Sequence, residues 1–377
     1  MKILINSVAA FFLVWPTFGM ALPEIARYGQ FTCTSCHVNP AGGGMLTTYG
    51  REFSEEKMST WAIEGEEKFL EGLVPMSDTI FFGGDARWIK YKSKTEDRLF
   101  EKFWRMQTDL EAGVHLGPVY VTGMMGTKPA GPTDDPKEHS NLIHRGYTLR
   151  ADLFDEHVMI RGGLFLPKYG LMLSDHTAYV RSASGLSPDG AQTQIELIYQ
   201  DDLFEFMLAK LIESKMYDRE RKTLSGFNLG VSTFVAEKNR ITASVLSTKK
   251  ILGTVETSVL SMGLSAVVTA TNKVFAMFEI NRVHNETKIS GTSAYSEVLA
   301  DFFTLNYEAY KGLIPYARYE FIDTDMNRKD TSTIRMGPGI NWYPRPHMQL
   351  ELRSFRAQSN ASHSTTNTTE GLMHYYF

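Results

Sequence analysis

The sequence predicts an all-β protein: a transmembrane, antiparallel, up-and-down β-barrel of about sixteen strands, preceded by a small and partly helical segment. Three observations carry this prediction. Apolar and polar residues alternate from residue 79 to the end, the connections between alternating segments are short and long in turn, and both cysteines lie in one short motif near the N-terminus. We divide the chain into residues 1–21, 22–77 and 78–377.

Composition excludes several other classes of protein. The chain has 377 residues with 39 basic and 43 acidic side chains, so it lacks the basic excess of a nucleic-acid-binding protein. Hydrophobic residues make up 43% and charged residues 22%, which excludes wholesale disorder. A mean hydropathy of −0.22 excludes a polytopic helical membrane protein. Aromatic residues, at 12%, are unusually frequent.

Residues 1–21 have the features of an export signal. A lysine at position 2 precedes an apolar run over residues 3–18, and small residues at 19 and 21 fit a signal peptidase site. We expect cleavage after Ala21. A membrane-anchor helix is the alternative, but the run is shorter than the roughly 20 residues needed and Pro16 interrupts it.

Both cysteines belong to the motif Cys33-Thr34-Ser35-Cys36-His37, the C-x-x-C-H attachment pattern for haem c. Two thiols at this spacing form thioethers with the haem vinyl groups, and the following histidine binds the iron. A zinc site would need more ligands, a thioredoxin-like pair would need a βαβ unit, and a disulfide over this loop would constrain little. We therefore predict one covalent haem on Cys33 and Cys36, with His37 as the proximal ligand.

The residues around the motif are predicted to form a cap over this haem. Residues 28–49 contain an Asn-Pro turn and three consecutive glycines that permit close backbone approach, and residues 51–73 suggest a short helix. The segment is too small to bury a porphyrin alone. We therefore expect the rest of the chain to cover it.

Period-two alternation then predicts the strands, because neighbouring side chains of a strand face opposite sides. Residue 104 to residue 112 is the clearest run: Trp104, Met106, Thr108, Leu110 and Ala112 alternate with Arg105, Gln107, Asp109 and Glu111. Short turns are predicted at one rim, and long loops at the other over residues 126–140, 167–192, 214–223, 284–293, 323–332 and 358–370. An even strand number places both ends of the barrel domain at the short-turn rim, expected on the periplasmic side.

Aromatic residues and barrel size complete this prediction. Trp88, Tyr91, Trp342 and Tyr343 lie near predicted strand ends, as in interfacial girdles, and the chain ends on Phe377 as outer-membrane barrels do. A barrel of about sixteen strands should enclose a water-accessible lumen. A secreted all-β protein is the alternative.

Loop 167–192 follows the fifth predicted strand, and resemblance to general porins of this size implies that it folds inward. His176 in this loop is a candidate distal haem ligand, oriented by Asp175, although an ordinary loop histidine would look the same. Met45, Met58 and Met76 are the rival distal ligands. Arg181 is a candidate partner of a haem propionate.

An export signal, one C-x-x-C-H motif and a barrel of about sixteen strands resemble the fused monohaem cytochrome–porins of the bacterial outer membrane. At the level of motifs, the resemblance depends on residues 28–37 and on Phe377. The best known members oxidise ferrous iron outside the cell. The resemblance implies that Cys33 and Cys36 carry the haem and that His37 ligates its iron.

These features predict an oxidoreductase-type role: electron transfer across the outer membrane, between an extracellular donor or acceptor and a periplasmic cytochrome. Ferrous iron or another metal is the candidate substrate. The haem segment is expected to plug the lumen, held by the inward charged residues Arg105, Asp109, Glu111, Arg161 and Arg353. One alternative is a solute-conducting porin whose haem plug gates or stabilises the channel, and another is a haem-anchored sensor or adaptor. Conductance measured with a redox titration would separate them.

Overall fold

The computed structural model shows a closed barrel of 16 antiparallel strands, each hydrogen-bonded to its sequence neighbours, with β1 closing on β16. The predicted fold class is confirmed. The structure describes residues 25–28, 33–40, 44–66, 68, 77, 79–96, 98–127, 142–175, 177–186, 190–212, 225–236, 238–252 and 254–376. The predicted export signal, Met76, His176 and Phe377 lie outside these residues.

The strands and helices have the following bounds. The strands are β1 (Ile80–Thr95), β2 (Arg98–Leu116), β3 (Val119–Thr127), β4 (Leu142–Leu153), β5 (Val158–Phe165), β6 (Gln192–Gln200), β7 (Phe204–Leu211), β8 (Ser225–Val235), β9 (Asn239–Leu252), β10 (Val255–Thr271), β11 (Val274–Ile289), β12 (Thr292–Tyr307), β13 (Leu313–Asp323), β14 (Ser332–Trp342), β15 (Met348–Ser359) and β16 (Ser364–Tyr376). The helices are η1 (Ile25–Tyr28), α2 (Cys33–Cys36), α3 (Thr48–Phe53), η2 (Ser54–Met58) and α4 (Tyr179–Ala183).

Strand β6 illustrates how the alternating sequence builds the barrel wall. Ile195 and Leu197 face outward and are 54% and 39% exposed, whereas Glu196 and Ile198 face inward and are fully buried. Exposed apolar side chains recur on the outer face of most strands. An outer face of this kind suits contact with lipid hydrocarbon rather than water.

A β-bulge in β2 changes which side chains face the lumen. Arg87 pairs with Gln107, but the next residue, Trp88, pairs with Arg105, so Met106 has no partner in the register. The extra residue reverses the alternation, because side chains on either side of a bulge swap faces. The prediction that Arg105 faces the lumen is therefore wrong: Arg105 is exposed on the outer side. The predicted single apolar face from 104 to 112 is interrupted for the same reason.

The two rims differ as predicted only in part, because four connections at the long-loop rim are short: β1 to β2, β9 to β10, β11 to β12 and β15 to β16. At the rim where β1 begins and β16 ends, every connection is short. At the other rim, the chain between β3 and β4, between β5 and β6, and between β7 and β8 is long. The predicted loops at 284–293 and 358–370 are wrong. Strands β11 and β12 pair as far as Ile289 and Thr292, and four residues join β15 to β16. Polar residues at 284–293 mark strands that extend beyond the bilayer, since β11 and β12 have 16 residues each and only about 9–11 would cross it.

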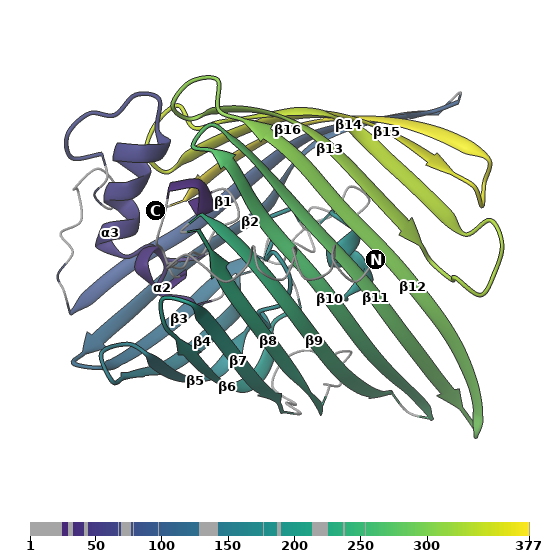
Figure 1. The fold of residues 1–377 in the computed structure, drawn as a ribbon, viewed down its shortest axis with the longest axis horizontal. Coiled ribbons are helices and arrows are strands. Elements are labelled where there is room, and N and C mark those ends of the chain that lie inside the picture. Colours follow the sequence, from purple (N-terminus) through teal and green to yellow (C-terminus); the bar gives the residue numbers. More distant parts are fainter. Residues whose placement is uncertain are drawn as a thin grey trace, which may run out of the picture.

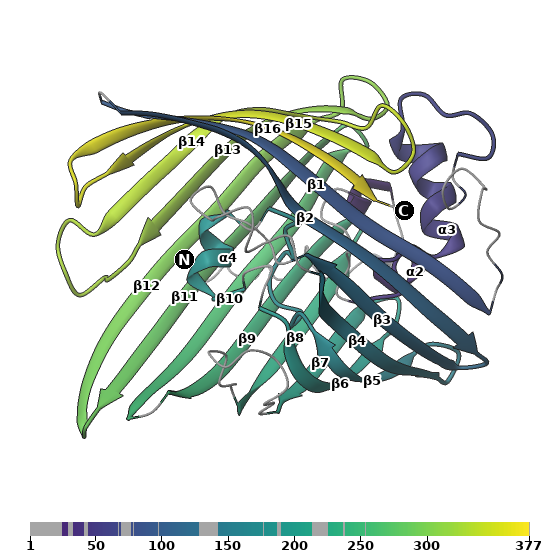
Figure 2. The ribbon, with the colours of Figure 1, turned by 180° about the vertical axis from the view of Figure 1, so that it is seen from behind.

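The long chain between β5 and β6, here called the inner loop (residues 166–191), folds into the barrel as predicted and carries α4 (Figure 2). Its apolar residues join the inner faces of β10 to β13 in one buried cluster. The members include Leu171, Leu173, Ala178 and Val180 of the loop, Phe275, Met277, Phe302 and Ile314 of the wall, and Ile25 and Phe53 of the N-terminal segment. This part of the lumen is a packed core, so the predicted water-accessible lumen is wrong here.

The described part of residues 25–66, here called the plug, lies at the short-turn rim beside the C-terminal end of β16 (Figure 1). The predicted helix over 51–73 is shorter than expected: α3 and η2 end at Met58, because Ser59 is extended and the chain turns onto the rim. None of the helices described is long and apolar enough to cross a bilayer.

Candidate functional site

The predicted haem-attachment residues lie on one helical turn in the plug. Helix α2 consists of Cys33 to Cys36, and His37 follows directly. Residues three apart lie on the same side of a helix, so this turn brings the two cysteine positions together. Cys36 and His37 are each 6% exposed. The residue types and their spacing on this turn are those of a covalent haem site, in which Cys33 and Cys36 would be the attachment points and His37 the iron ligand.

Helix α3 packs directly on this turn. Thr47 is its N-cap: its hydroxyl accepts from Gly50 N at 3.0 Å, and its backbone N–H donates to Cys36 O at 3.0 Å. The Thr47 hydroxyl also donates to Ser35 O at 2.5 Å. A side chain at Gly50 would overlap the carbonyl of Cys36. Glycine at position 50 therefore permits the close approach of α3 to the motif.

After the motif the chain forms a small hairpin, residues 37–46, here called the motif hairpin. His37 and Leu46 form an antiparallel bridge, and Val38 N donates to Met45 O at 3.1 Å. Gly44 has a φ of 65°, a left-handed conformation that glycine adopts without strain. Residues 41–43 lie outside the described chain, so the predicted role of Gly42 and Gly43 stays a prediction.

Three wall residues, here called the wall clamp, hold the motif hairpin: Glu111 on β2, Arg150 on β4 and Arg161 on β5. The Glu111 carboxylate accepts from Met45 N at 3.0 Å, and Arg150 Nη1 donates to Val38 O at 2.7 Å. Arg161 Nη1 donates to Asn39 Oδ1 at 2.6 Å. The plug is therefore fixed to the barrel wall through the residues that follow the haem motif.

The inward charged residues predicted from sequence divide into three groups. Glu111 and Arg161 contact the plug, which confirms their predicted position. Asp109 lies in the lumen beside Arg145, 3.3 Å away, and Arg353 binds the inner loop instead of the plug. Sequence reasoning missed Arg150, although an arginine two residues before Asp152 in an alternating segment is the signal that could have identified it.

The plug has a second attachment at the rim, between residues 60–66 and the chain joining β14 to β15. Thr60 N donates to Tyr343 O at 2.8 Å and Trp61 N to Pro344 O at 3.0 Å. Trp342 donates to the Thr60 hydroxyl at 3.1 Å and stacks edge-on against Trp61. Trp342 and Tyr343 therefore hold the plug, which corrects their predicted place in a lipid-facing girdle.

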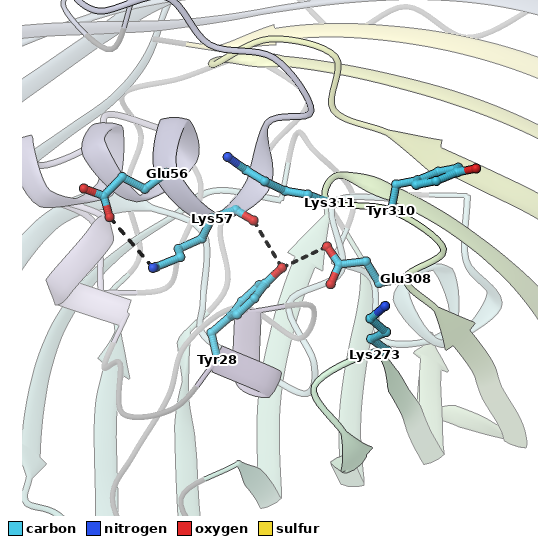
Figure 3. A pocket seen from close by; sticks show the side chains of 7 residues that line it. All are labelled: Tyr28, Glu56, Lys57, Lys273, Glu308, Tyr310 and Lys311. Carbon is cyan, nitrogen blue, oxygen red and sulfur yellow. Dashed lines mark hydrogen bonds and ion pairs between the residues drawn. The ribbon is translucent and has the colours of Figure 1, made fainter.

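A cavity of about 300 Å³ opens at the seam between the plug and the turns that follow β10 and β12 (Figure 3). Three lysines, two glutamates and two tyrosines line it. The Tyr28 hydroxyl donates to Glu308 at 3.1 Å and to Lys57 O at 3.2 Å.

Arg51 of α3 also contacts the wall. It is almost fully buried and its Nη2 donates to Phe82 O at 2.6 Å. Burial lowers the pKa of Arg51 to about 10. The guanidinium therefore stays protonated at neutral pH and places a fixed positive charge beside the haem motif.

The distal haem ligand stays a prediction. Met45 lies in a cluster with Val38 and Phe81, and Met58 packs on the separate core that contains Phe53. In the described part of the chain, no group of three or more His, Cys, Asp or Glu side chains could hold a metal ion. Arg181, the predicted propionate partner, is buried in α4.

Asp175 is one of several residues that fasten the inner loop to the wall. Its carboxylate accepts from Arg318 Nη1 at 2.6 Å and from Arg353 Nη1 at 2.5 Å, and from Thr177 N at 2.9 Å. Burial alone would raise the pKa of Asp175, but the two arginines outweigh burial and hold that pKa well below its usual range. Tyr179 N adds a bond to Glu320 at 2.8 Å.

No protein-family model matches the sequence, and no curated protein matches it. Solved structures do. An anion-selective porin from Comamonas acidovorans aligns over 79% of this chain and 99% of its own length, with a TM-score of 0.62 and 10% identity. OmpT of Vibrio cholerae aligns over 81% and 100% with a TM-score of 0.59 and 12% identity. The outer-membrane channel DcaP of Acinetobacter baumannii aligns over 79% and 97%, with a TM-score of 0.58 and 12% identity. The chain therefore shares the barrel fold of outer-membrane porins.

Proposed function

We propose that this chain is a porin-type channel of the outer membrane, closed by an N-terminal plug that carries one covalent haem. The likeness to outer-membrane porins and the apolar outer face both support this location and lipid contact. The observation that carries the channel function is the plug itself. It lies at one rim of a closed barrel and packs on the inner loop in one core, so moving it would uncover that rim of the lumen.

Cys33 and Cys36 would hold the haem by thioether bonds, and His37 would ligate its iron. The haem would supply a one-electron Fe(II)/Fe(III) couple. The surrounding residues restrict water, since Cys36 and His37 are nearly buried and α3 covers the turn. Arg51 keeps a positive charge nearby. A haem held in this way is part of the plug and moves with it.

The test is planar-bilayer conductance of the purified full-length protein, with haem content measured by the pyridine haemochrome assay. We expect one haem per chain, and a low conductance that rises when the plug is displaced. A Cys33→Ser/Cys36→Ser variant should lose the haem. A large conductance that ignores both the plug and the haem redox state would contradict the proposal.

A second candidate function is an electron relay across the outer membrane, and the C-x-x-C-H turn inside a packed barrel mouth favours it. A periplasmic cytochrome would meet the plug at the short-turn rim, and an external donor or acceptor such as ferrous iron would react at the other rim. The comparisons favour the channel, because the named neighbours are porins and channels. The packed lumen around the inner loop favours the relay.

Proteoliposomes distinguish the two functions. With a soluble cytochrome c inside and a membrane-impermeant reductant outside, a relay reduces the internal cytochrome without ion conductance. Activity that persists in Cys33→Ser/Cys36→Ser would reject the relay. Conductance without internal reduction would leave the channel as the function.

A further inference from the structure

We propose that Arg150 and Glu111 are positioning residues for the haem ligand: the barrel wall, rather than the plug, fixes the backbone on which His37 lies. This inference rests on the proposed haem attachment. It assigns to two side chains of the barrel a role in setting the properties of a haem bound to another segment.

The first step of the argument is the path from His37 to the wall. Val38 follows His37 directly, and its carbonyl accepts from Arg150 at 2.7 Å. On the opposite strand of the motif hairpin, Met45 N donates to Glu111 at 3.0 Å. Both wall contacts therefore fall within one residue of the His37–Leu46 bridge, one on each strand.

The second step is that Arg150 is itself held in place. Its Nε donates to Asp152 Oδ1 at 2.6 Å, its Nη2 binds Asp152 Oδ2 at 2.5 Å, and its guanidinium lies 4.7 Å from the centre of the Tyr120 ring. Paired charge-assisted bonds and ring stacking fix both the plane and the direction of a guanidinium. Arg150 is 4% exposed, so its bond to Val38 O is shielded from water.

The third step is the fit of the hairpin against Glu111. A side chain at Gly44 would displace the Glu111 carboxylate, and the φ of 65° at this position favours glycine, so glycine permits the close approach of the hairpin to Glu111. Neighbouring Asp109 is turned toward Arg145 instead. The carboxylate of Glu111 therefore remains directed at the plug.

The fourth step is that the plug cannot by itself fix the position of the backbone at His37. Helix α2 has four residues and α3 has six. The buried apolar residues of the hairpin, Val38 and Met45, cluster with Phe81 of the barrel. Segments of this size do not fold on their own without a partner surface.

The experiment compares Arg150→Met and Glu111→Leu with two reference variants in the full-length protein. Glu111→Gln keeps an oxygen acceptor for Met45 N and should behave like wild type. Glu205→Leu removes a carboxylate on β7 that binds Lys168 and Arg240, and it controls for loss of a lumen charge. Heat-modifiable gel mobility verifies that each barrel is folded.

Two measurements follow. The first is the haem reduction potential and the Soret spectrum, which a merely structural residue would leave unchanged at constant haem content. The second is tryptic cleavage after Arg51, which is 2% exposed and therefore protected while the plug is seated. We expect Arg150→Met and Glu111→Leu to shift the potential and to speed cleavage by roughly tenfold, since each loses a hydrogen bond to the backbone of the motif hairpin.

The outcomes separate this inference from the proposed function. An unchanged potential in folded, haem-loaded Arg150→Met and Glu111→Leu overturns the positioning role, as does an equal shift in Glu205→Leu. Absence of haem from the wild-type protein overturns both the proposed haem and the positioning of its ligand. In that case the cleavage rates still show whether the wall clamp seats the plug.

Discussion

The plug and the inner loop both occupy the lumen, yet the barrel holds them in different ways. The wall clamp and the rim bind the plug mainly at backbone atoms, such as Val38 O, Met45 N and Thr60 N. The inner loop is held by buried ion pairs, Asp175 with Arg318 and Arg353 and Lys168 with Glu205, by hydrogen bonds such as Leu171 N to Glu279, and by an apolar core. Loss of one backbone bond of the plug leaves no charge unpaired, whereas loss of a buried charge also removes a partner from the opposite charges around it. The two segments should therefore respond differently to single substitutions.

The largest effect is expected for Asp175→Asn. Removing the shared carboxylate of a largely buried charge network leaves Arg318 with only Glu320, and Arg353 with Glu351 and Glu370, which costs at most about 3–5 kcal/mol. We expect the inner loop to loosen around residue 175, with faster proteolysis within residues 166–191 and lower thermal stability. Glu297→Gln, which removes the partner of the exposed Arg282, is the matched control. Equal stability of the two variants would remove Asp175 as a fastening residue.

The next effect is expected for Gly50→Val in the plug. The new side chain would overlap the Cys36 carbonyl and force α3 away from the motif, at a cost of about 1–3 kcal/mol. Faster tryptic cleavage after Arg51 is the readout, with the barrel unchanged by gel mobility. Gly123→Val is the control, because a side chain there meets open space and Gly123 has no positive φ. Wild-type protection in Gly50→Val would show that α3 does not need this close approach.

A smaller effect is expected for Trp61→Ala at the rim. It removes the edge-on contact with Trp342 but leaves the backbone bonds of Thr60 and Trp61 intact. Such aromatic contacts contribute about 0.5–1.5 kcal/mol. Cleavage after Arg51 should rise only a few-fold. A complete loss of protection would mean that the rim, and not the wall clamp, seats the plug.

The smallest effect is expected for pH between 5 and 8. The depressed pKa of Asp175 means that its contribution is fully present above the ordinary aspartate value of 3.8 and is lost as pH falls through the lower folded pKa. Proteolytic protection of the inner loop should therefore stay constant from pH 8 to pH 5 and fall only in stronger acid. Release of the loop near pH 6 would assign its attachment to another group.

Much of the fold could be predicted because the lipid-facing and lumen-facing sides impose a period of two on each strand. The prediction was wrong where one extra residue, Met106, shifts the alternation of inward-facing and outward-facing side chains. A bulge of this kind leaves no clear mark in the hydrophobic pattern. It was wrong also at 284–293, where polar residues were interpreted as a loop. Polarity indicates contact with water, and a strand beyond the bilayer meets water as a loop does.

For the candidate site, the sequence predicted the local chemistry better than the long-range contacts. The spacing of Cys33, Cys36 and His37 is enough to predict how these residues lie relative to one another, because all three lie within about one helical turn. Arg150 lies more than a hundred residues further along, and its contact with Val38 depends on barrel closure. Alternation identifies which residues face inward, but not which of them meets the plug.

The near-complete burial of Cys36 and His37 also bears on the order in which the chain is modified and folded. With 6% of each residue exposed, the folded barrel leaves no room for an enzyme to reach this thiol. Any covalent modification of Cys36 must therefore precede the seating of the plug. The packing therefore implies an order of steps in biosynthesis: Cys36 is modified first, and the barrel encloses the plug afterwards.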